Sequence, residues 1–195
     1  MELQKEYIQQ QEDVIRRNFG ARLLYIKSAR FRAIQAFCAH FKHILSVGCG
    51  TYEPLAIGAT HALDVSSLSH EYLKQLGWHG VFEVGSCDAL PWQSKFFDVA
   101  VCSEVIEHLP DLDIVHHAVQ ELERVAHNWI LTTPCNPLGP KNTEPDHKRA
   151  FTEQELRDLC PKEKVKIFKD EIFYYVVRFD NEQDTAVFDR HFKAI

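Results

Sequence analysis

Apolar and polar positions alternate along this chain in two rhythms, one typical of strands and the other typical of amphipathic helices. Short apolar runs lie at residues 44–47, 81–84, 97–102 and 129–133, and a further run ends at Asp64. The run at 97–102 is almost continuous, as expected for a central strand of a parallel sheet. Each run is followed by a glycine, a proline or a polar residue. The pattern therefore predicts five successive strands.

Between the runs, apolar residues return every three or four positions, which predicts helices with one buried face. These helical stretches are 2–18, 28–41, a short one ending at Gly77, and one with a clear period over 115–125. Thr152 and Glu155 form a predicted capping box for a further helix. Residues 164–169 and 172–179 predict two strands joined tightly enough to pair antiparallel. Strands that alternate with helices and end in a hairpin predict an α/β fold with a parallel sheet and one reversed strand.

Length and composition fit one globular domain with a full core. The chain has 195 residues, of which 45% are hydrophobic and 26% are charged. The net charge of −6 argues against strong, general binding to nucleic acid or to an anionic membrane. The longest apolar runs are strand-sized and the N-terminus is polar, so we expect a cytoplasmic protein without a signal peptide or a membrane span. The six cysteines form no CxxC pair and are expected to be reduced thiols.

The stretch 43–64 carries the first sign of chemistry. An apolar run ends in Gly48-Cys49-Gly50, and a second apolar run ends at Asp64. A strand that enters a glycine turn and then a helix exposes backbone N–H groups to a nucleotide cofactor, and an acid after the next strand can accept ribose hydroxyls. The dinucleotide fingerprint GxGxxG is incomplete, because Glu53 stands where its third glycine belongs.

The same stretch resembles the first motif of class I S-adenosylmethionine-dependent methyltransferases, in which an acid usually stands two residues before GxGxG. Ser46 occupies the position of that acid, and Tyr52 occupies the position of the last glycine. The gap from Gly50 to Asp64 is 64 − 50 = 14 residues, against about 20 in the related dinucleotide folds. We expect Tyr52 to compensate for the short helix by packing against the cofactor or by closing the cleft.

Residues 85–111, GSCDALPWQSKFFDVAVCSEVIEHLPD, strengthen the resemblance. They are similar to the pattern GDAxxLPF…FDxVxxxxVLEHLxD of small-molecule methyltransferases, in the correct order after the glycine motif. The resemblance covers residues 43–135 well and residues 147–156 more loosely. It implies a Rossmann-like, seven-stranded, mostly parallel sheet with helices on both faces and a reversed last strand. It also implies a single domain over 1–195, with a helical cap at 1–41, a cofactor-binding core at 42–135, and an acceptor loop, terminal helix and hairpin at 136–195.

Carried over residue by residue, the resemblance implies a site for S-adenosyl-L-methionine outside the carboxyl ends of the strands. The two glycines correspond to residues that line the methionine and ribose, and Asp64 corresponds to the ribose ligand. The adenine contact is open between Ser86, which stands where the family has an acid, and Asp88 or the backbone of Cys87. The expected cofactor-binding residues are Gly48, Cys49, Gly50, Asp64, Val65, Ser86, Cys87, Asp88, Cys102 and Ser103.

Methyl transfer needs a nucleophile held in line behind the methyl group, so positioning supplies most of the acceleration. An oxygen or nitrogen acceptor also has to lose a proton, ideally to a group that titrates near neutrality. The candidates for a catalytic base are His108 and His147, with Glu107 behind them. We therefore expect an enzyme, monomeric or homodimeric, that methylates an oxygen or nitrogen of a small or medium-sized molecule.

Two alternatives have different consequences. Glu104, Glu107, His108 and His147 resemble the metal ligands of metal-assisted RNA 2′-O-methyltransferases, and a helical turn would gather the first three on one face. We expect no metal, because the helix dipole favours acids at a helix start without an ion, and the net charge counts against RNA. The second alternative is a cofactor-binding regulatory module without catalysis, suggested by the departures in the glycine motif.

Overall fold

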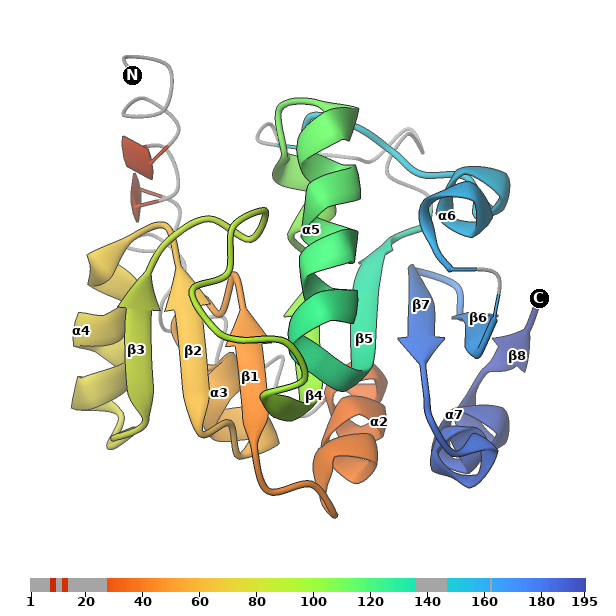
Figure 1. The fold of residues 1–195 in the computed structure, drawn as a ribbon, viewed down its shortest axis with the longest axis horizontal. Helices are drawn as coiled ribbons and strands as arrows, with labels where there is room; N and C mark the ends of the chain where they lie inside the picture. The colour runs from red at the N-terminus through yellow and green to blue at the C-terminus, as the bar shows by residue number, and fades with distance from the viewer. Residues whose placement is uncertain (1–7, 10–11, 14–27, 136–146, 162) are drawn as a thin grey trace.

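The computed structural model describes residues 8–9, 12–13, 28–135, 147–161 and 163–195, and their strands form one sheet with helices on both faces (Figure 1). The strand order is β3-β2-β1-β4-β5-β7-β6-β8. Strands β1 to β5 pair in parallel, whereas β7 runs antiparallel to its neighbours β5 and β6. The strands are β1 (Ile44–Val47), β2 (His61–Asp64), β3 (Val81–Val84), β4 (Phe97–Ser103), β5 (Ala126–Pro134), β6 (Val165–Lys169), β7 (Phe173–Arg178) and β8 (Lys193–Ala194).

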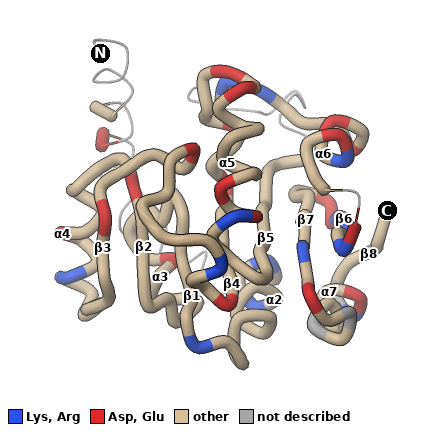
Figure 2. The backbone as a smooth tube through the Cα atoms, viewed as in Figure 1, with Lys and Arg blue, Asp and Glu red and all other residues tan. Residues whose placement is uncertain are grey.

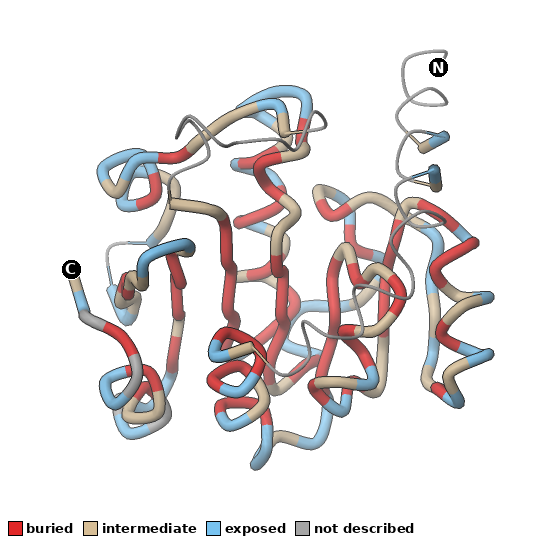
Figure 3. Tube along the Cα trace, turned by 180° about the vertical axis from the view of Figure 1, so that it is seen from behind, coloured by how far each residue is buried: buried red, intermediate tan, exposed pale blue. Residues whose placement is uncertain are grey.

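The helices pack on two layers of alternating strand side chains. They are α2 (Ala29–Cys38), α3 (Glu53–Ile57), α4 (Ser67–Gln75), α5 (Leu112–Val125), α6 (Glu153–Leu159) and α7 (Ala186–His191), with short 3₁₀ turns η2 (Ile106–His108) and η3 (Glu182–Thr185). One layer packs against α5 and α6 and includes Ala100 and Leu131. The other packs against α2, α3 and α7 and includes Val101 and Ile130. The central strands are accordingly buried on both faces (Figure 3).

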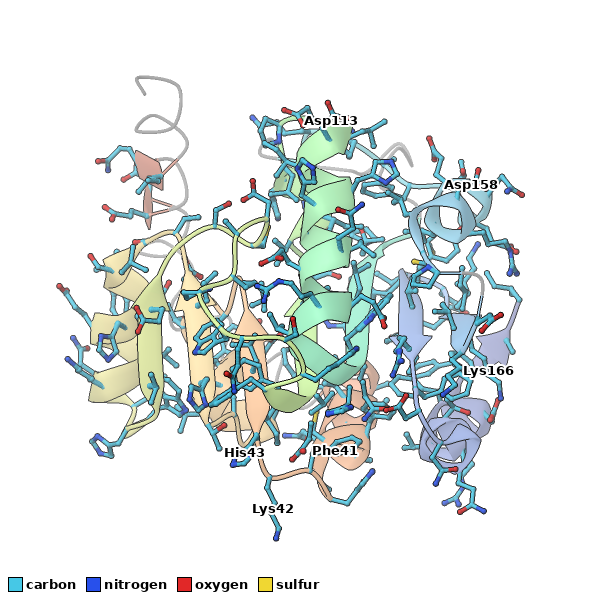
Figure 4. The ribbon with its side chains drawn as sticks, in the orientation of Figure 1. Phe41, Lys42, His43, Asp113, Asp158 and Lys166 are labelled. Carbon is cyan, nitrogen blue, oxygen red and sulfur yellow. The ribbon has the colours of Figure 1, made fainter. Side chains whose placement is uncertain are left out.

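The carboxyl ends of the parallel strands meet at one edge of the sheet, at the top of Figure 1. There β1 and β4 lie side by side. From β1 the chain continues to β2 on one side of this pair, and from β4 it continues to β5 on the opposite side. Such a reversal leaves a crevice in which α/β folds bind their ligands. Asp113 in α5 and Asp158 in α6 lie toward this edge, and Lys42 and His43 lie at the opposite edge (Figure 4).

The predicted fold class is confirmed, including the reversed strand in a terminal hairpin. The capping box is present, since the Thr152 hydroxyl accepts the Glu155 N–H at 3.2 Å and the Glu155 carboxylate accepts the Thr152 N–H at 2.7 Å. Strand β5 begins three residues earlier than predicted, because α5 runs directly into it without a loop. Helix α7 and the two-residue strand β8 were not predicted, since neither is long enough to show a period.

Part of the prediction falls outside the described residues. The helix expected at 2–18 is described only at 8–9 and 12–13, which are helical, and the loop after Pro134 is not described at 136–146. The six cysteines are all described, and none of them is paired in a disulfide. None of the described helices has the length and apolar character that crossing a membrane would require.

The turn after β1 packs against the turn after β4, and this contact yields the first prediction. Gly48 has a φ of +63°, and a Cβ there would lie 2.4 Å from a methyl carbon of Val105. Gly48→Ala should therefore add backbone strain of about 1–2 kcal/mol and overpacking of about 1–3 kcal/mol. Denaturant unfolding measures the loss. Adding Val105→Ala should recover the overpacking part, and a double variant no more stable than Gly48→Ala would contradict this account.

Candidate functional site

The glycine turn leaves room for a ligand above it. The backbone N–H groups of Gly48 and Cys49 both donate to the carbonyl of Leu63, at 2.8 and 3.1 Å, which fastens the turn to β2. Gly50 has a φ of +54°, and a Cβ built on it would meet no atom within 4 Å. The next hydroxyl, that of Thr51, is buried and has no hydrogen-bond partner within the described part of the chain. The turn thus offers open space and a polar group that needs a partner.

Asp64 lies beside this space at the end of β2. Its two carboxylate oxygens accept the N–H groups of Gly50 at 2.9 Å and Ser66 at 3.0 Å. Burial raises the pKa of Asp64, and these hydrogen bonds oppose the rise. The thiol of Cys49 also donates to the carboxylate, at 3.9 Å, so Asp64 is held firmly at the end of β2. The Ser66 hydroxyl donates to the carboxylate of Glu12 at 2.9 Å, which brings the N-terminal segment to this end of β2.

The loop after β3 brings Ser86, Cys87 and Asp88 to the same edge. The Ser86 hydroxyl donates to the Asp88 carboxylate, so the two candidates for the adenine contact lie together. Cys87, between them, is buried. Arg124 of α5 holds the loop through the carbonyls of Trp92 and Leu90, at 2.6 and 2.8 Å. The sequence pattern did not predict these hydrogen bonds of Arg124.

A buried carboxylate that the sequence did not predict lies between β1 and β4. Glu53, the first residue of α3, turns back so that its Oε1 accepts the Ser46 hydroxyl at 2.7 Å. Ser103, at the end of β4, faces the same carboxylate. Glu53 is only 5% exposed. Burial raises its pKa to about 7, although the serine hydroxyls and the charge of Arg30 oppose the rise.

Arg30 of α2 lies near this carboxylate and pairs with a second one. Its Nη1 lies 3.1 Å from Oε1 of Glu104, and the same Oε1 accepts the Thr132 hydroxyl at 2.9 Å. The guanidinium lies over the rings of Phe31 and Phe173, 5.0 and 4.5 Å from their centroids. Its Nε is buried and has no hydrogen-bond partner among the described residues.

The residues proposed as a base form a second group. One ligand atom from each of Glu107, His108 and His147 lies within 4.8 Å of the others. The two imidazole rings meet edge to face with centroids 4.7 Å apart. The Glu107 carboxylate is fully buried and accepts the Thr133 hydroxyl at 3.1 Å. Burial, together with repulsion from Glu104, raises the pKa of Glu107 well above its ordinary value.

Glu104 does not join this second group, contrary to the expected helical turn. It has a φ of +57° and precedes η2, so it is not part of a helix. Its partner Thr132 lies on the face of β5 that bears Ile130, toward α2, whereas Thr133, the partner of Glu107, lies on the opposite face. The two glutamates are therefore held on different sides of the sheet edge.

Other predicted site residues take supporting places. Cys49 and Cys102 are buried in the core. Val65 directly follows β2. The Tyr52 ring lies 5.6 Å from the ring of Phe31, so it fastens α2 to the glycine turn. Its expected contact with the cofactor stays a prediction.

Comparison with known proteins agrees with this fold. Residues 45–128 match a family model described as a methyltransferase domain. The fold is similar to that of an S-adenosylmethionine-dependent methyltransferase, a possible histamine N-methyltransferase, from Thermotoga maritima, with 19% identity over 85% of this chain and 95% of that one and a TM-score of 0.64. The fold is also similar to that of an S-adenosylmethionine-dependent methyltransferase from Clostridium acetobutylicum, with 13% identity over 83% of this chain and 98% of that one and a TM-score of 0.62. A third similar structure is the methyltransferase domain of bacterial CtHen1-CN, with 18% identity over 78% of this chain and 98% of that one and a TM-score of 0.61. No curated protein matches the sequence.

The buried carboxylate leads to a prediction about pH. Because the pKa of Glu53 rises from 4.5 to about 7, the native protein keeps a proton that the unfolded chain has released. Raising the pH through this window therefore favours unfolding, and at about 1.4 kcal/mol per pH unit the cost is on the order of 3 kcal/mol. Glu53→Gln should lack this loss. Denaturant unfolding at pH 5 and pH 8, in EDTA, compares the two proteins, and an equal pH dependence would contradict the assignment.

Proposed function

We propose that this chain, which carries a class I S-adenosylmethionine-dependent methyltransferase domain in residues 45–128, methylates an oxygen or nitrogen atom of a small or medium-sized acceptor. The observation that carries the proposal is the open space over Gly50, bordered by Asp64 and by the buried, unpartnered hydroxyl of Thr51. These groups suit the ribose and the adjoining part of the cofactor, because they combine room, a hydroxyl acceptor and an unsatisfied hydroxyl.

The residues at the carboxyl edge would divide the work of binding. Asp64 would accept the ribose hydroxyls, and the Ser86–Asp88 loop would border the adenine. S-adenosylmethionine supplies an electrophilic methyl group, and the chain has to hold the acceptor in line with it and exclude water. Positioning of this kind is the largest contribution a protein makes to such a transfer.

The group of Glu107, His108 and His147 is suited to take up the acceptor's proton. Two imidazoles lie next to each other, and imidazole titrates near neutrality, as a base for a hydroxyl or amine requires. The backbone N–H groups of Lys148 and Arg149 donate to the carbonyl of Glu107, at 2.7 and 3.2 Å, which fastens His147 over η2. We propose His108 or His147 as the base, with Glu107 behind them.

One observation favours the alternative, metal-assisted RNA methylation. The same three residues could supply a carboxylate oxygen and two imidazole nitrogens to a divalent ion, and among the described residues Oε1 of Glu107 and Nδ1 of His147 are buried without hydrogen-bond partners. Glu104, the fourth residue of the resemblance, is instead paired with Arg30. In the described segments, Lys and Arg are dispersed over several elements and are not gathered along the carboxyl edge, as an RNA surface would require (Figure 2).

Two glycines with the same backbone strain test cofactor binding. Gly50 and Gly58 both have positive φ and open space at the Cβ position, but Gly58 ends α3 at the other edge of the sheet. Alanine at either position should cost about 1–2 kcal/mol of stability. Only Gly50→Ala should weaken binding of S-adenosylhomocysteine, by about tenfold or more, because its methyl group would enter the ligand space. Titration calorimetry measures this, and equal affinities in the two variants would contradict the proposed site.

Chelation separates the two candidate functions. Methyl transfer to a panel of small oxygen and nitrogen acceptors, and to short RNA with a 3′-terminal 2′-hydroxyl, is measured with EDTA and with added magnesium or manganese. We expect transfer to a small acceptor that survives EDTA. Transfer to RNA that is lost in EDTA and restored by a metal would instead establish the alternative. Cofactor binding without transfer to either class of acceptor would favour a regulatory module.

A further inference from the structure

The acid that the glycine motif lacks in sequence is present in space. Ser46 stands where related proteins have an acid, and its hydroxyl donates to the carboxylate of Glu53 at 2.7 Å. Both residues are buried, Ser46 completely. Glu53 is placed there because α3 begins at this residue, immediately after the glycine turn. A carboxylate thus lies at the end of β1, although it comes from the helix that follows.

The buried cluster around this carboxylate holds more negative charges than positive ones. Glu53 and Glu104 contribute two negative charges when ionised, and Arg30 contributes one positive charge. Ser46, Ser103 and Thr132 add only neutral hydroxyls. An uncompensated buried charge is unstable, so the group either takes up a proton or binds a cation. A cationic ligand group would complete the pocket.

We propose that Glu53, positioned by Ser46, binds the α-ammonium group of the amino-acid part of S-adenosylmethionine. The inference rests on the proposed function, because it assumes that the cofactor occupies the open space over Gly50. The inference assigns the contact with the α-ammonium group to a residue of α3, whereas the sequence pattern would place it at the end of β1.

The position of Glu53 along the edge agrees with this assignment. Asp64, the proposed ribose ligand, ends β2, whereas Glu53 lies between β1 and β4, the next strands along the sheet. A cofactor with its ribose at Asp64 and its adenine beyond β3 would direct its amino-acid end toward β4.

Two probes that differ only at this end of the cofactor test the inference. S-adenosylhomocysteine carries the α-ammonium but no sulfonium charge, and 5′-deoxy-5′-methylthioadenosine lacks the whole amino-acid part. Glu53→Gln should weaken S-adenosylhomocysteine about tenfold or more and change methylthioadenosine affinity less than about threefold, since only a charge-assisted hydrogen bond is lost. Calorimetry on the full chain gives both affinities. An equal loss for both probes, or no loss for either, would overturn the inference.

An exchange of the two residues separates binding from a structural role. Glu53→Ser should lose S-adenosylhomocysteine affinity, and Ser46→Asp combined with Glu53→Ser should regain most of it, because the acid returns to β1. A structural role for Glu53 would give no recovery, and that result would overturn the inference even if Glu53→Gln fails to fold. Failure of the unaltered protein to bind either probe would refute the proposed function itself. Normal binding of both probes by Glu53→Gln would refute only the assignment of Glu53.

Discussion

Burying carboxylates between β1 and β4 is unfavourable, and much of the surrounding structure reduces that cost. Glu53 is buried and Glu104 is partly buried near the point where the sheet changes direction, and burial raises the pKa of both. Arg30 neutralises one of the two charges. It lies beside them because α2 packs on one face of the sheet, where the ring of Phe31 contacts the ring of Tyr52. The crevice of an α/β fold is generic, but its charge in this chain depends on these few contacts.

The edge of the sheet also separates two kinds of chemistry. Glu104 and Glu107 are three residues apart, yet the left-handed φ of Glu104 turns it toward Thr132 while Glu107 meets Thr133 on the other face. One glutamate therefore belongs with Arg30 and the other with the two histidines. A single helical turn over this segment would have put both carboxylates in one group and removed the ion pair between Glu104 and Arg30. The separation keeps the proposed binding pocket distinct from the proposed base.

The sequence was sufficient for the fold because the fold depends on periodicity. The continuous run of β4 and the heptad-like period of α5 are local signals, and so is the capping box at Thr152. The glycine turn and Asp64 were predictable because each stands at the end of a strand. Glu53 and Arg30 were not, since their role depends on a side chain turning back and on the docking of a helix. The one sign available in the sequence was that Glu53 follows Ser46, the position of the expected acid, by seven residues.

The unusual features of the glycine motif have a common physical cause. For Glu53 to reach Ser46, α3 has to begin directly after the turn, which leaves no room for a further glycine and brings Pro54 into the first turn of the helix. The helix has only five residues and ends at Gly58, and β2 begins at His61. This accounts for the short interval between Gly50 and Asp64. Tyr52, which replaces the last glycine, uses its ring to hold α2 over the same carboxylate. Ser46 in the strand, the short helix and the tyrosine are thus parts of one arrangement, in which the helix and not the strand supplies the acid.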